Sequence, residues 1–338
     1  MDTQVTIYDV AKRARVSPAS VSRVFSKKAV VAEGTRQRVL EAAAQLKFSA
    51  NRLAAGLRRG KTDAISLIIP YNTPELMDSA QQAANARHFT MMVCSTFKPN
   101  VEAEIRALRM ALEHRVAGVI WQPTGQVGDY EEILASLRTS STAVVLLERG
   151  QDIMPQADLV YHDTEEGFRM GIDHLTSAGY RNVAYVTQDA NYTLRRSRHE
   201  QFERVAGEAA FSISYGQQEL AGLIDQTISQ AQGPVGFLCD DDWTALATVN
   251  HLEQIGCRVP QDAGAIVLGD LLVGPFRVGE IARPTISALQ RQQKQVAQKC
   301  VDWLMERINA DPSEPPAPAR RHGVAPTLVP RESTLQIT

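Results

Sequence analysis

The sequence predicts an α/β protein in which a small all-helical head precedes a large core of doubly wound parallel sheets. Three observations lead to this prediction. Apolar residues recur at helical spacing, without a strand pattern, over the first 49 residues. From Asp63 onward, short apolar runs alternate with segments of helical pattern. Basic residues are concentrated in the first 61 residues, so the head and the core differ in charge as well as in pattern.

The head contains three predicted helices. The first covers Thr6–Ala14, where apolar residues lie on one helical face. The second runs from Pro18 to about Phe25, because Ser17 is a suitable N-cap and proline suits the first helical position. The turn between them has about three residues, which is typical of a helix-turn-helix. The third helix covers about Glu33–Leu46, and its expected apolar residues are Val39, Leu40, Ala43 and Leu46.

A hinge follows the head. Ala50–Leu57 is compatible with a helix but is too short to be stably helical by itself. The basic residues Arg58–Lys61 close this segment before the pattern changes.

The core shows the strand–helix alternation of parallel sheets that are covered by helices on both faces. The expected strands are Ile65–Pro70, Thr90–Cys94, Gly118–Trp121, Ala143–Leu147, Leu159–Tyr161, Val183–Thr187, Val235–Cys239 and Ala265–Leu268. The expected helices are Glu75–Arg87, Val101–Glu113, Tyr130–Ser136, Glu165–Ala178, Arg198–Ala206, Leu220–Ala231, Trp243–Ile255 and Gln290–Asn309. Pro312–Pro318 reads as a stiff, exposed connector.

Charge separates the two parts of the chain. Residues 1–61 carry thirteen lysines and arginines against four acidic residues, a net charge of +9. The remainder has a net charge of −11, so the overall value of −2 hides the difference. A basic head is attracted to nucleic acid because it releases the counterions condensed on the phosphates. The alternative is a basic surface without a partner.

Several other classes of protein find no support. The four cysteines have no spacing for a metal site or a disulfide framework. We expect no signal peptide, no membrane span and therefore a cytoplasmic protein. Asp240–Asp242 is an acidic run whose oxygens suit a divalent cation, but without further spaced acids we expect no metal. No phosphate-binding glycine loop or nucleophile motif is present, so we expect no catalytic residues, no cofactor and no enzyme activity.

The head resembles the LacI/GalR (lactose-repressor-like) family of transcription regulators. The resemblance lies in Thr6–Ala14, Val16–Val24 and Val31–Arg36, and it continues through the hinge at Asn51–Leu57. Weaker matches follow in the family's order across the core, at Gly118–Ile120, Gly167–Gly179 and Leu328–Ser333.

The resemblance implies a division of the chain into a DNA-binding domain, a hinge and an effector-binding core. These parts cover residues 1–49, 50–61 and 62–338. The core would have two subdomains like those of periplasmic binding proteins, and would also form the homodimer. The subdomains would cover approximately 62–160 with 290–322, and 161–289 with 323–338.

The family places its second helix in the major groove of DNA. The implied DNA-binding residues are Thr6, Ser17, Pro18, Ala19, Ser20, Ser22, Arg23, Asn51, Ala54, Leu57 and Arg58. Arg23 suits a guanine or a phosphate, whereas Pro18 and Ala19 lack side-chain donors and favour apolar or shape readout. Alternatives remain open: Pro18 initiates the helix, Arg23 is a solvated charge, and Leu57 is a contact between two hinges rather than a minor-groove wedge.

The family binds its effector between the two subdomains. The implied effector-binding residues are Tyr71, Arg149, Asp163, Arg198, Asp241, Trp243 and Asp270. The sequence departs from the family's pattern after Pro70, where the loop is short, and at Asp241, where asparagine is usual. The cluster Arg195–His199 either holds an anion or is a solvated helix start, the commoner case.

These features predict a dimeric repressor of carbohydrate-utilisation genes that binds a pseudo-palindromic operator. Its small-molecule effector would be a sugar, sugar acid or sugar phosphate, and no membrane is involved. The alternative is a DNA-bound regulator whose core is controlled by a protein partner rather than a sugar.

Overall fold

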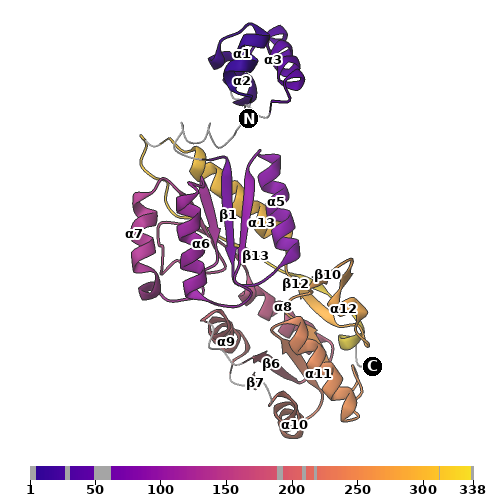
Figure 1. Cartoon of the computed structure of the whole chain (residues 1–338). Helices are drawn as coiled ribbons and strands as arrows, with labels where there is room; N and C mark the ends of the chain where they lie inside the picture. Colours follow the sequence, from indigo (N-terminus) through magenta and orange to yellow (C-terminus); the bar gives the residue numbers. More distant parts are fainter. Residues whose placement is uncertain are drawn as a thin grey trace. The chain divides into compact units, whose positions relative to one another are not determined.

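A computed structural model describes residues 5–26, 31–48, 62–188, 193–207, 211–216, 219–311 and 313–335 (Figure 1). The chain divides into two compact units, Met1–Thr62 and Asp63–Thr338. We call them the head and the core and describe each by itself.

The head is built from α1 (Ile7–Ala14), α2 (Pro18–Ser26) and α3 (Glu33–Gln45). Arg15 ends α1 in the left-handed conformation, with φ of 51°, and so turns the chain sharply toward α2. The core of the head is formed by side chains that are at most 5% exposed, namely Val10, Ala11, Ala14, Val21, Val24, Val39, Ala42 and Ala43. The predicted apolar face of the third helix was wrong at Leu40, which is 48% exposed, because the helix instead turns Ala42 inward.

The first lobe of the core contains a parallel six-stranded sheet in the order β13-β5-β4-β3-β1-β2. Its strands are β1 (Ala64–Ile69), β2 (Thr90–Ser95), β3 (Gly118–Trp121), β4 (Ala143–Leu147), β5 (Asp158–His162) and β13 (Arg321–Val324). Its helices are α5 (Pro74–Ala86), α6 (Val101–Glu113), η1 (Val127–Tyr130), α7 (Glu131–Thr139) and α13 (Gln293–Asn309). Along β1, Ile65, Leu67 and Ile69 pack with α5 and α13, and Ile68 packs with α6 on the other face.

The second lobe repeats this plan with the order β14-β12-β9-β8-β6-β7. Its strands are β6 (Asn182–Gln188), β7 (Phe211–Tyr215), β8 (Val235–Cys239), β9 (Ala263–Val267), β12 (Ser287–Gln290) and β14 (Thr327–Val329). Its helices are α8 (Thr164–Ser177), α9 (Thr193–Ala206), α10 (Leu220–Gln230), α11 (Asp242–Gln254), α12 (Val278–Ile281) and η2 (Glu332–Thr334). α8 and α9 cover one face of the sheet, and α10 and α11 cover the other.

Two features of the second lobe depart from a simple parallel sheet. β14 pairs antiparallel with β12 and covers that edge of the sheet. A small hairpin of β10 (Leu272–Val273) and β11 (Phe276–Arg277) follows β9. The chain passes between the lobes three times, after β5, β12 and β13. The sheets therefore point the carboxyl ends of their parallel strands toward one region between the lobes, where open α/β sheets bind ligands.

The sequence missed β7, the β10–β11 hairpin, β12, β13 and β14, and it began α9 five residues late. The missed strands are two to five residues long, and several contain few apolar residues, so no apolar run marks them. Among the described residues, no helix is long and apolar enough to span a bilayer.

Candidate DNA-binding face and effector cleft

The second helix of the head exposes the residues that the family resemblance assigns to DNA. Pro18, Ala19 and Arg23 are exposed, whereas Val21 and Val24 are buried against α1 and α3. The Ser17 hydroxyl accepts a hydrogen bond from the Ser20 amide at 3.1 Å, which is the geometry of an N-cap. Ser17 and Ser20 therefore fix the start of α2, and the half-buried Ser22 lies one turn later.

Thr6 lies at the start of α1 and is exposed. Its amide donates to the Asp9 carboxylate at 2.8 Å and its hydroxyl donates to the same oxygen at 2.6 Å. These hydrogen bonds lower the pKa of Asp9, so the carboxylate stays ionised at the positive end of the helix. Tyr8 of the same helix is 70% exposed, and the sequence did not single it out. The predicted hinge residues Asn51, Ala54, Leu57 and Arg58 lie outside the described residues.

Strand ends of both lobes line a cavity of about 360 Å³, which we call the cleft. The first lobe contributes Tyr71–Leu76 after β1, Gln122 after β3 and Glu148 after β4. The second lobe contributes Asp240–Trp243 after β8 and Leu268–Leu272 after β9. Of the predicted effector residues, the cleft brings together Tyr71, Arg198, Asp241, Trp243 and Asp270.

Asp240 is the centre of the cleft's ion pairs and is only 2% exposed. It accepts hydrogen bonds from Arg198 Nη1 at 3.1 Å and from Tyr185 Oη at 2.9 Å, and Arg195 Nε lies 3.8 Å away. Burial alone would raise the pKa of Asp240, but the charges of Arg198 and Arg291 outweigh it, and the pKa falls below its ordinary value. The interpretation of the arginine cluster as a solvated helix start was therefore wrong, because Arg195 and Arg198 turn inward from α9.

Asp241 has two structural roles at the start of α11. One carboxylate oxygen caps the helix by accepting from the Thr244 amide at 2.9 Å. The other accepts from Arg195 at 3.2 Å. The negative charge of Asp241, where the family usually has asparagine, is therefore balanced by Arg195.

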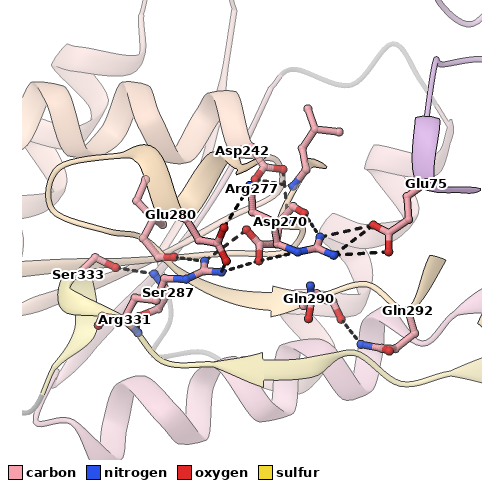
Figure 2. Close-up of polar contacts among 12 residues, drawn as sticks. Glu75, Asp242, Asp270, Arg277, Glu280, Ser287, Gln290, Gln292, Arg331 and Ser333 are labelled. Atoms are coloured by element: carbon pink, nitrogen blue, oxygen red, sulfur yellow. Dashed lines mark hydrogen bonds and ion pairs between the residues drawn. The ribbon is translucent and has the colours of Figure 1, made fainter. Parts of the chain in front are cut away.

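Asp270 belongs to an ion-pair network that reaches both lobes (Figure 2). Its carboxylate accepts from Arg331 Nη2 at 2.7 Å and is buried. Arg277 donates to the Asp270 carbonyl oxygen at 2.7 Å and lies 3.4 Å from the Glu75 carboxylate. Figure 2 shows Arg277 pointing from the second lobe toward Glu75, which stands in the first turn of α5. Asp270 therefore orients an arginine that links the lobes beside the cleft.

Glu148 and His162 form a second pair in the cleft, with His162 Nδ1 bonded to Glu148 Oε1. Burial alone would raise the pKa of Glu148, but the charge and hydrogen bond of His162, with Arg198 and Arg291, lower it to about 2. Asp242 accepts from the Leu271 amide at 3.0 Å and holds the loop after β9, and burial raises its pKa. The sequence missed Glu148, which directly follows β4, and Arg291, which follows the unpredicted β12.

Two aromatic side chains face the cleft from opposite lobes. Trp243 at the start of α11 is 65% exposed, and Tyr71 after β1 is 39% exposed. Burial raises the pKa of Tyr71, so its hydroxyl stays protonated and can donate a hydrogen bond. These two rings offer apolar surface with polar tips, whereas the carboxylates around them are already paired.

Arg149 and Asp163 do not lie in the cleft. Both line a second cavity beside it. Asp163 caps α8 by accepting from the Glu166 amide at 3.1 Å, and Arg149 donates to the carbonyl oxygens of Pro123 and Gly125 at 3.2 and 2.7 Å. Within the described part of the chain, no group of three or more histidine, cysteine or acidic side chains is arranged to hold a metal ion.

Comparison with known proteins identifies both units. The family described as bacterial regulatory proteins of the lacI family matches residues 6–51, and the periplasmic binding protein-like domain matches residues 172–334. The chain is 28% identical over 346 residues to the HTH-type transcriptional repressor PurR of Aliivibrio fischeri strain MJ11, covering 98% of each chain. It is 26% identical to the PurR repressor of Haemophilus influenzae strain PittEE, covering 98% of this chain and 99% of that one.

Solved structures share the fold. The lac repressor dimer bound to operator and an anti-inducer aligns with a TM-score of 0.75 at 21% identity, over 98% of this chain and all of that one. A LacI-family regulator from Silicibacter pomeroyi aligns with a TM-score of 0.72 at 19% identity, over 98% and 99% of the two chains. The curated relatives are repressors and not enzymes. The chain belongs to the LacI/GalR family and is a DNA-binding transcription regulator, not an enzyme.

Proposed function

We propose that this regulator is a homodimeric repressor whose affinity for a pseudo-palindromic operator changes when a small, ring-shaped polar molecule binds in the cleft. The observation that carries the proposal is the cleft itself, in which residues after β1, β3, β4, β8 and β9 surround about 360 Å³. A ligand there contacts both lobes and so favours one arrangement of them, which is the requirement for regulation by a ligand. As a DNA-binding regulator the protein would act in the cytoplasm.

The lining of the cleft favours a neutral ligand. Asp240, Asp241 and Asp270 each have an arginine partner, so the paired carboxylates present hydrogen-bond acceptors rather than free charge. Tyr71 and Trp243 add faces on which a ring can stack. A sugar meets both conditions, and a solved relative in complex with cellobiose, the regulator CelR, agrees with this class. A flat heterocycle would use the same two rings, so purine bases are the second candidate.

The DNA-binding half of the proposal is tested by selecting duplexes from a random library with the full chain and footprinting the enriched sequence. Two inverted half-sites are expected, because a two-fold dimer reads both halves in the same way. Arg23→Gln should weaken binding to the selected duplex by about tenfold, as expected for the loss of one bidentate contact. A single half-site, or unchanged affinity of Arg23→Gln, would contradict the proposed dimer or the proposed contact respectively.

The ligand-binding half is tested by thermal unfolding against sugars, sugar acids, sugar phosphates and purine bases. A ligand of the native cleft raises the melting temperature by mass action. The shift should disappear in Trp243→Ala and persist in Arg258→Gln, an exposed arginine paired with Asp262 away from the cleft. A well-folded protein that responds to no member of the panel would favour control by a protein partner.

A further inference from the structure

A second cavity of about 410 Å³, which we call the lateral pocket, adjoins the cleft. It is lined by the chain after β4, the first turn of α8, the face of α9 and the start of β13. Glu148, His162 and Arg198 line both cavities and stand between them. The family resemblance gave no role to this pocket, but two of the predicted effector residues, Arg149 and Asp163, lie in it.

The lateral pocket is basic. Five arginines and three carboxylates line it. The arginines are Arg149, Arg169, Arg198, Arg204 and Arg321, and the carboxylates are Glu148, Asp163 and Glu165. Asp163 and Glu165 are engaged within the second lobe, by the cap of α8 and by Arg169. Arg198 is paired with Asp240, and Arg169 with Glu165 and Glu166, so the charge that a ligand meets comes mainly from Arg149, Arg204 and Arg321.

Two of these arginines have mainly neutral partners. Arg149 is 15% exposed and donates to the backbone carbonyl oxygens of Pro123 and Gly125, and the Asp152 carboxylate lies 4.0 Å away. Arg321 is exposed, and its guanidinium lies 5.9 Å from the centre of the Tyr161 ring. The carbonyl oxygens and the aromatic ring hold the side chains in place without cancelling their charge, and at Arg149 the Asp152 carboxylate offsets part of it.

The wall of the pocket also carries buried polar atoms without a hydrogen-bond partner among the described residues. One is Nε2 of His162, a side chain that is only 7% exposed and whose Nδ1 is bonded to Glu148. The other is the amide oxygen of Gln201, a residue that also lines the pocket. A buried polar atom without a partner costs free energy, and a ligand that supplies the partner recovers it.

We propose that the lateral pocket binds the phosphoryl group of a small phosphate monoester. A monoester carries about −1.5 to −2 charges at neutral pH, and a pocket lined by five arginines favours an anion of this kind. Guanidinium groups bind phosphate oxygens through paired hydrogen bonds. Because Nδ1 of His162 is bonded to Glu148, Nε2 is the ring atom left to hydrogen-bond the ligand. The site is separate from the proposed effector site, and the shared wall couples the two.

Calorimetric titration of the full chain with inorganic phosphate and with glycerol 1-phosphate, at constant ionic strength in chloride buffer, tests the proposal. Both probes should bind saturably. Arg321→Gln and Arg204→Gln should each weaken both probes at least threefold, and the double variant at least tenfold. Both arginines are exposed, so thermal unfolding of the variants should match the parent. Arg258→Gln, which removes a surface arginine outside the pocket, should bind like the parent.

Several outcomes would overturn the assignment. If neither phosphate probe binds saturably, the lateral pocket is not an anion site. If acetate binds as tightly as phosphate, the pocket is not selective for a phosphoryl group. If phosphate binds but glycerol 1-phosphate does not, the ligand is not a phosphate monoester. Loss of phosphate binding in Trp243→Ala, but not in Arg321→Gln, would place the anion in the cleft. Such a result would leave the proposed effector site standing and refute only the lateral pocket.

Discussion

The cleft and the lateral pocket share a wall but use charge in opposite ways. In the cleft, Asp240, Asp241 and Asp270 are paired with arginines that also hold the second lobe together. In the lateral pocket, Arg149 and Arg321 are held mainly by carbonyl oxygens and an aromatic ring, and only Arg149 has a carboxylate nearby, Asp152 at 4.0 Å. The charge that a cavity offers to a ligand therefore depends on how its charged residues are paired, and not only on how many there are.

The largest effect on stability is expected for Arg198→Ala, which removes a buried ion pair of the cleft. Arg198 and Asp240 are 8% and 2% exposed, and the substitution leaves a buried carboxylate short of its partner. We expect a loss of about 3–5 kcal/mol in the free energy of unfolding. Urea denaturation measures this loss. Arg321→Gln is the control, with an expected change within about 0.5 kcal/mol, and a similarly small effect of Arg198→Ala would show that the cleft's pairs are not structural.

Low pH should destabilise the protein by protonating Glu148, which lines both cavities. The pKa of Glu148 in the folded protein is about 2, below its ordinary value of 4.5, so the stabilisation is present above pH 4.5 and is lost as pH falls toward 2. The shift corresponds to about 3 kcal/mol. Urea denaturation from pH 7 to pH 3 should therefore show a smaller acid-dependent loss for Glu148→Gln than for the parent. Parallel stability curves for the two proteins would contradict this role of Glu148.

A smaller effect is expected from Glu75→Gln, which removes the charge that faces Arg277 across the lobes. The pair is 3.4 Å apart and partly exposed, so its contribution to stability is at most about 1 kcal/mol. Because the pair joins the lobes, the substitution should weaken binding of a cleft ligand several-fold while phosphate binding in the lateral pocket is retained. Titration of both ligands measures the difference, and an equal loss of both would refute the separation.

Much of the fold could be predicted from the sequence, because its signals are local. The N-cap Ser17, the first-turn Pro18 and the buried Val21 and Val24 define α2 without reference to the rest of the chain. The long apolar strands of both sheets were predicted for the same reason. β14 was not, because a strand of three residues is defined by its pairing with β12 and not by its own pattern.

The candidate site was less predictable, because its contacts join distant parts of the chain. Glu75 and Arg277 are 202 positions apart, and Asp270 and Arg331 are 61 apart. The sequence marked Arg198 and Asp270 as residues of interest but could not indicate that each already has a charged partner. Arg149 and Asp163 were predicted to line the cleft with these residues. Each follows a strand, but the side chains of both line the lateral pocket instead.

Occupation of the core should change the affinity of the head for DNA. Fluorescence anisotropy of the full chain on the selected duplex, with and without the ligand that raises the melting temperature, tests this claim directly. Allosteric coupling free energies of about 1–3 kcal/mol predict a change in operator affinity of at least about fivefold at saturating ligand. An operator affinity that stays constant while the ligand saturates the cleft would show that the core does not regulate DNA binding through this ligand.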